Sequence, residues 1–145
     1  MRLLLLLLPL GLFGNDILQC EQSDIINGNG FTPSGEFRWY LINKDTKEIT
    51  FFNEESLRDK TLEQINNKQW DVYKYTLKET AEELIGVFDN SEYVFIDRIK
   101  LSVIHYKTQL DLWYAFDYEC KLIDVDELLE NVKQEYMSFK LSLKL

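Results

Sequence analysis

The chain has 145 residues, an apolar fraction of 46% and a formal net charge of −9 at pH 7. This length suits one domain, and the apolar and aromatic content can fill a core, which excludes a largely disordered chain. The lysines are interleaved with acidic residues and form no basic stripe. Such a surface repels phosphate backbones and anionic lipid, so we expect neither nucleic-acid binding nor membrane-surface binding.

Residues 1–14 have the composition of a signal peptide. One basic residue, Arg2, precedes an uninterrupted apolar run. This run is too short to cross about 30 Å of hydrocarbon as a helix. We therefore expect cleavage after Gly14, a mature domain over 15–145, a secreted or periplasmic location, and no stable membrane insertion once the leader is removed. An uncleaved anchor, a buried helix and lipid modification of Cys20 remain alternatives.

The chain contains two cysteines, Cys20 and Cys120. Two cysteines in an exported protein favour one disulfide, although two free buried thiols are the alternative. A disulfide requires the two Cα atoms to lie within about 7 Å of each other. If the cysteines pair, the first strand of the domain must therefore lie close to the last.

Most of the remaining sequence indicates short strands. Runs rich in β-branched and aromatic residues alternate with turn-forming residues at hairpin spacing. We expect strands near 17–21, 37–42, 48–52, 70–77, 84–88 and 110–120, with two more within 93–106 that meet in a bend at Asp97 and Arg98.

The stretch 93–123 contains the longest alternating pattern, and we expect the rest of the chain to be organised around it. Successive side chains of a strand point to opposite faces of the sheet. In 93–106 the odd-numbered residues are the more apolar set, so we expect them to face the core. In 110–120 the even-numbered residues should face the core, which puts Trp113 on the opposite face.

The end of the chain predicts a helix over 124–140. Asp124 and Glu127 have the spacing of a capping box, and apolar residues recur at helical intervals after them. A shorter helix should begin at Asn53. Its apolar side would consist of Leu57, Leu62 and Ile65.

Together these elements predict a mainly β (α+β) domain. We expect an antiparallel meander of about eight short strands with one C-terminal amphipathic helix. If Cys20 and Cys120 pair, the two ends of the meander meet. A small closed barrel would then leave no strand edge unpaired.

The sequence shows no marked catalytic constellation. His105 is the only histidine, and no nucleophile or metal ligand stands at a recognisable spacing from it. Nucleophile elbows, paired-cysteine zinc patterns and dinucleotide-binding fingerprints are also missing from the sequence. We expect a protein that is not an enzyme, with no catalytic residues, no metal site and no cofactor.

A possible binding surface is formed by Trp113, Trp39, Tyr40 and His105. Aromatic residues in small β-domains more often pack in the core, so this set competes with an ordinary structural role. The acidic surface favours a basic protein partner, and with it an inhibitor-like or immunity-like binding protein. The alternative is a small barrel that binds an apolar small molecule.

Three short features together resemble small, uncharacterised secreted proteins of Gram-negative bacteria. They are Cys20 just inside the mature N-terminus, the segment 95–98 (Phe-Ile-Asp-Arg) followed by a second strand, and the closing segment 118–121 (Tyr-Glu-Cys-Lys). The resemblance covers most of 15–123. It implies a secreted or periplasmic β-domain with one cysteine bridge and no particular activity. The helix that follows Asp124 is a departure from this pattern.

Overall fold

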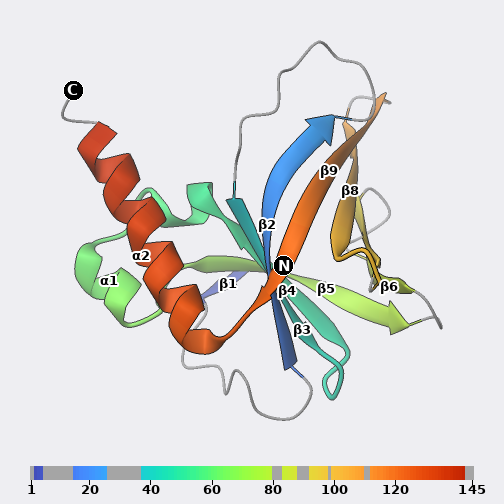
Figure 1. Cartoon of the computed structure of the whole chain (residues 1–145), viewed down its shortest axis with the longest axis horizontal. Helices are drawn as coiled ribbons and strands as arrows, with labels where there is room; N and C mark the ends of the chain where they lie inside the picture. The colour runs from blue at the N-terminus through green and yellow to red at the C-terminus, as the bar shows by residue number, and fades with distance from the viewer. Residues whose placement is uncertain are drawn as a thin grey trace.

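The computed structural model describes residues 2–4, 15–25, 37–79, 83–87, 92–97, 99–109 and 112–142 (Figure 1). The strands are β1 (Arg2–Leu4), β2 (Asn15–Ile25), β3 (Phe37–Asn43), β4 (Glu48–Asn53), β5 (Asp71–Glu79), β6 (Glu83–Val87), β7 (Glu92–Asp97), β8 (Ser102–Gln109) and β9 (Leu112–Ile123). The helices are the 3-10 helix η1 (Glu54–Leu57), α1 (Leu62–Asn66) and α2 (Val125–Ser142).

Strands β2 to β9 form a closed antiparallel barrel. Each strand pairs with the next one along the chain, and β2 also pairs with β9, from Ile17 opposite Ile123 to Ile25 opposite Phe116. Closure leaves the barrel with no open side, which is one way that β proteins avoid edge-to-edge association. The predicted meander and its closure into a barrel are confirmed.

Strand β1 adds to the edge of β5. Its residues Arg2, Leu3 and Leu4 lie opposite Tyr73, Val72 and Asp71. Strand β6 pairs with β5 only from Thr76 onward, so β1 occupies the part of this edge that the barrel does not use. These three residues belong to the predicted leader, and the rest of the leader, 5–14, lies outside the described residues. Cleavage of the leader stays a prediction.

The disulfide between Cys20 and Cys120 lies on the seam that closes the barrel. The two residues are direct partners across β2 and β9, and their Cα atoms are 4.0 Å apart. The predicted pairing and the predicted proximity of first and last strand are both confirmed. A disulfide indicates an oxidising environment outside the cytoplasm.

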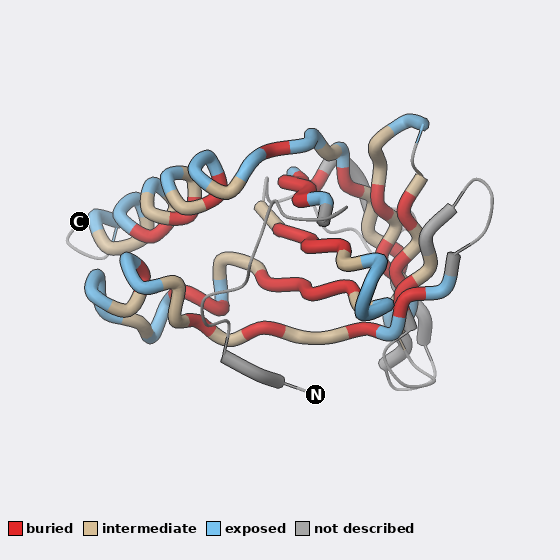
Figure 2. Tube along the Cα trace, turned by 90° about the horizontal axis from the view of Figure 1, so that it is seen from below, coloured by how far each residue is buried: buried red, intermediate tan, exposed pale blue. Residues whose placement is uncertain are grey.

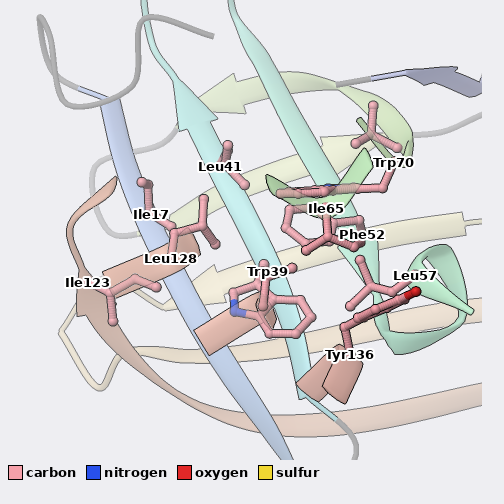
Figure 3. Close-up of a cluster of buried hydrophobic side chains, with 12 residues drawn as sticks. Ile17, Trp39, Leu41, Phe52, Leu57, Ile65, Trp70, Ile123, Leu128 and Tyr136 are labelled. Atoms are coloured by element: carbon pink, nitrogen blue, oxygen red, sulfur yellow. The ribbon is translucent and has the colours of Figure 1, made fainter. Parts of the chain in front are cut away.

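The barrel strands bury residues on both of their faces, and this produces two separate cores. The inner core fills the barrel and consists of Leu18, Cys20, Tyr40, Ile42, Ile49, Phe51, Tyr75, Leu77, Val94, Ile96, Val103 and Tyr118. The outer core lies between the barrel wall and the helices (Figure 3), and consists of Ile17, Trp39, Leu41, Phe52, Leu57, Ile65, Trp70, Val72, Ile123, Leu128, Val132 and Tyr136.

Helix α2 covers the outer core with one apolar stripe. Leu128, Val132 and Tyr136 recur every four residues and are all buried, while the opposite side of the helix is exposed (Figure 2). Asp124 caps the helix, because its Oδ1 accepts the Glu127 N–H at 2.8 Å. The helix predicted over 124–140 is therefore confirmed, and it continues to Ser142.

The prediction of which face each residue takes was correct for β8 and wrong for β7. Val94 and Ile96 face the barrel interior, whereas Tyr93 is 36% exposed. Antiparallel partners share a face, and Val94 lies opposite His105. An even-numbered residue of β7 therefore shares its face with an odd-numbered residue of β8, because the turn between the strands changes the phase of the alternation.

The single helix predicted after Asn53 is two short helices. Asn53 caps η1 as expected, but Thr61 starts a new capping box and α1 follows it. Leu57 and Ile65 are buried in the outer core, whereas Leu62 is 47% exposed. The break between the helices turns Leu62 away from the apolar side on which the sequence placed it.

Candidate functional site

Polar side chains collect at one end of the barrel, which we call the mouth. Residues at this end come from β3, β4, β5, β7, β8 and β9 and from the helix η1. They surround a pocket of about 180 Å³. Its described lining consists of Arg38, Phe51, Asn53, Glu55, Tyr73, Tyr75, Glu92, His105, Lys107 and Phe116.

His105 is at the centre of this arrangement and is only 4% exposed. Its Nδ1 lies 3.1 Å from Nη1 of Arg38 and 3.3 Å from the hydroxyl of Tyr40. Its Nε2 lies 3.3 Å from Oε2 of Glu92 and 3.4 Å from the hydroxyl of Tyr75. Both ring nitrogens therefore have polar partners inside the barrel.

The partner of Nδ1 determines the protonation state of His105. A guanidinium group can only donate hydrogen bonds and stays charged in proteins. Nδ1 must therefore accept the bond from Arg38, which leaves the proton on Nε2 to be donated to Glu92. Burial lowers the pKa of His105, and the charge of Arg38 lowers it further, although the bond to Glu92 opposes this. His105 is thus a neutral imidazole of defined tautomer.

Glu92 supplies the negative charge of the site. Its Oε2 accepts the hydroxyl of Tyr75 at 2.7 Å as well as the bond from His105, and its Oε1 lies 3.7 Å from Nζ of Lys107. The hydrogen bond from His105 is the largest cause that lowers the pKa of Glu92, which falls to about 2 although burial opposes the change. Burial raises the pKa of Tyr75, and the bond to Glu92 raises it further. Glu92 is ionised and Tyr75 is a neutral donor at neutral pH.

Arg38 is held between two aromatic rings. Its Cζ lies 5.1 Å from the ring centre of Phe51 and 4.7 Å from that of Tyr118. Cations over aromatic faces are stabilised by the ring quadrupole, and the effect is larger where water is excluded. The rings therefore fix the plane of the guanidinium inside the barrel.

The two ring nitrogens of His105 are surrounded by a carboxylate, a cation and two hydroxyl groups. Where a histidine activates a nucleophile, one nitrogen of the histidine is oriented by a carboxylate while the other faces a hydroxyl or thiol. The unprotonated nitrogen of His105 faces both the cation of Arg38 and the hydroxyl of Tyr40, and the described lining holds no serine, threonine or cysteine. The described residues also contain no group of three or more side chains suited to a metal ion.

The structure separates Trp39 from Tyr40 and His105, three of the four residues that the sequence suggested as a binding surface. Tyr40 and His105 meet at the mouth, as described above. Trp39 points to the opposite side of β3, is fully buried in the outer core, and donates its Nε1–H to Oε1 of Gln19 at 3.0 Å. Trp113 lies in β9 opposite Thr108, and its side chain is outside the described part of the chain.

Sequence reasoning missed the charged residues of the site. Arg38 had a usable signal, because it has the same strand phase as Tyr40 and Ile42, which makes it a charge on an otherwise apolar face. Glu92 and Lys107 had none, since each stands at a strand end where charged residues are common. They are neighbours only through the pairing of β7 with β8, in which Glu92 lies opposite Lys107.

Comparisons with protein-family models, with curated proteins and with solved structures gave no match. Within the described ranges, no helix is both long enough and apolar enough to cross a membrane. The geometry of the mouth pocket is therefore the basis on which a function is assigned.

Proposed function

We propose that the protein is a secreted or periplasmic, non-enzymatic binding protein that holds a small polar ligand in the mouth of its barrel. The location follows from the predicted leader together with the disulfide between Cys20 and Cys120. The binding role follows from the pocket, because ligand sites in proteins are concave and carry a few well-placed polar groups.

The observation that carries this proposal is a network in which the partly buried charges of Arg38 and Glu92 meet the buried Tyr40, Tyr75 and His105. Burying charged groups costs several kcal/mol per ion before pairing offsets it, and apolar residues of similar size often stabilise a protein more. The remainder of the inner core is mainly apolar, so the barrel does not need charges to fill it. A polar network beside an open pocket is explained by recognition of a ligand.

The size and lining of the pocket favour a small polar ligand over the apolar one that the sequence left as an alternative. The pocket of about 180 Å³ is smaller than the roughly 300–1,000 Å³ typical of sites for drug-sized molecules. Most of the barrel interior is occupied by the inner core. A ligand that enters the mouth meets Arg38, Glu92 and Lys107 among its first contacts.

A basic protein partner is a second candidate, supported by a separate feature. Glu21 and Glu119 lie directly opposite each other across the β2–β9 seam, and both are exposed. Like charges in this position are destabilising unless a cation lies near. A basic partner would relieve the repulsion, and a Glu119→Gln change should then weaken its retention on a low-salt affinity column.

The single histidine allows a direct test of ligand binding at the mouth. The protein, labelled with ¹⁵N-histidine and ¹⁵N-tryptophan, is screened against small anionic, neutral and cationic compounds while the imidazole resonances of His105 are followed. We expect at least one class to shift these resonances in a saturable way. The indole N–H of Trp39 in the outer core is the internal control and should not move. The proposal would be contradicted if no class of compound shifted the His105 resonances, or if the resonances of His105 and Trp39 shifted equally.

A further inference from the structure

The lining of the mouth pocket carries two cations and two anions, so its formal charge is balanced, although the whole chain carries a formal charge of −9. Arg38 and Lys107 are the two cations of its lining, Glu92 is the more enclosed of its two anions, with a side chain that is 17% exposed, and His105 is neutral. Glu55 also borders the pocket, but its side chain is 72% exposed and lies 3.8 Å from Arg58. Water and this partner screen the charge of Glu55.

Glu92 is poorly placed to bind a cationic ligand. Tyr75 and His105 both approach its Oε2, and Lys107 approaches its Oε1. A cationic ligand would have to displace one of these partners and would meet Arg38 nearby. Arg38 has five N–H donors, and Lys107 has three on a side chain that is 52% exposed. The donors of the pocket are therefore better suited to an anion.

The walls of the pocket are aromatic. Phe51, Tyr73, Tyr75 and Phe116 all border it, and the rings of Phe51 and Tyr73 are stacked with their centres 5.9 Å apart. An engineered cavity of about 150 Å³ lined by apolar residues holds one benzene molecule. The mouth pocket, at about 180 Å³, therefore has room for one ring and a small polar group.

We infer that the ligand of the mouth pocket is a small planar carboxylate, of the size of a monocyclic aromatic acid. Its carboxylate would face Arg38 and Lys107, and its ring would lie against Phe51 and Phe116. This inference rests on the proposed function and adds the chemical class of the ligand. Carboxylates match the planar fork of arginine donors, and planar rings pack well on aromatic walls.

Four probe compounds distinguish the contribution of the ligand's charge to binding from that of its ring. Benzoate is the anionic ring, benzamide its neutral counterpart, benzamidine its cationic counterpart, and acetate the carboxylate without a ring. We expect benzoate to shift the His105 imidazole resonances and to bind at least about tenfold more tightly than each of the others, because each of the others lacks either the charged hydrogen bond or the buried ring. Benzamide or benzamidine binding as tightly as benzoate would overturn the inference, as would equal binding of acetate.

A pair of lysine variants tests the positioning of the carboxylate. Lys107→Gln should weaken benzoate binding about threefold to tenfold, as expected for a partly exposed charge contact, and should leave the binding of benzamide unchanged. Lys74→Gln is the matched control, because Lys74 lies outside the pocket and pairs with Glu48 at 3.4 Å. Equal losses in the two variants would contradict the assignment of Lys107.

The outcomes distinguish this inference from the proposed function. If benzoate leaves His105 unchanged while another class of compound shifts it, the ligand class is wrong and the binding role stands. If no compound of any class shifts His105, both are wrong.

Discussion

The two cores share the same strands but have different contents. The outer core is apolar and aromatic, and its main polar contacts lie at its margins, where Trp39 donates to Gln19 and Tyr136 donates to the backbone carbonyl of Lys60. The inner core is apolar over most of its length but ends in a network of charged and polar groups around His105. Apolar packing is thus sufficient to hold the sheet against the helices. The polar end of the inner core is not needed for this packing, and we therefore assign the binding role to it.

The largest expected effect comes from the outer core. Trp39→Ala should lower the free energy of unfolding by about 3–5 kcal/mol, because it removes a fully buried ring and leaves a cavity. Urea denaturation measures the loss. The resonances of His105 should stay where they are in the folded variant, since Trp39 and His105 lie on opposite faces of the barrel wall.

Leu62→Ala is the control for Trp39→Ala on the helical side of the molecule. Leu62 is 47% exposed, so its truncation should change the free energy of unfolding by less than about 0.5 kcal/mol. A similar small effect for Trp39→Ala would mean that the outer core does not support the fold as described.

The disulfide tests how far the inner core depends on closure of the barrel. A double variant, Cys20→Ala with Cys120→Ala, should have a free energy of unfolding about 2–4 kcal/mol lower. The reason is that the bridge restricts the unfolded chain between two residues that are 100 apart in sequence. Urea denaturation with and without reductant gives the same comparison in the unmodified protein. A loss smaller than about 1 kcal/mol would show that strand pairing alone holds the seam.

Glu92 should make the polar end of the inner core sensitive to acid. Its pKa is about 2 in the folded protein and near 4.5 when unperturbed, so the unfolded chain binds the proton more readily. Stability from this group is present above about pH 4.5 and is lost as the pH falls toward 2, by about 2–3 kcal/mol in total. Glu92→Gln should remove that part of the slope in unfolding measurements from pH 6 to 2.5. An unchanged slope would show that Glu92 is not held as described.

His105 should have a smaller effect at milder pH. Its pKa is lowered in the folded state, so its neutral form contributes stability above the unfolded value of about 6.5, and this contribution declines as the pH falls below that value. His105→Gln keeps an acceptor for Arg38 and a donor for Glu92. The variant should have a free energy of unfolding about 1 kcal/mol lower at pH 7.5. Its stability should also decline less steeply between pH 7 and 5. A direct NMR titration in which His105 protonates near or above pH 6.5 would contradict the lowered pKa of the buried imidazole.

Local patterns were sufficient for most of the elements. The hairpin of β3 and β4, the strand β5 and the helix α2 all followed from alternation, turn residues and capping, since these signals depend on residues close in sequence. Which residues of β7 face the barrel interior could not be predicted in the same way. This depends on the number of residues in the turn after Asp97, where Asp97 Oδ1 accepts the N–H groups of Ile99 and Lys100 and Leu101 takes a positive φ of 52°.

The sequence by itself determined the mainly β class, the C-terminal helix and the two cysteines whose pairing brings the ends of the meander together. Only the tertiary structure decided that both faces of β3 are buried, so that Trp39 and Tyr40 belong to different cores, and that Arg38, Glu92 and His105 form one network. Alternation and capping act between near neighbours and can be read along the chain. The network instead joins residues from three strands, and the relative registers of distant strands are settled only when the barrel closes.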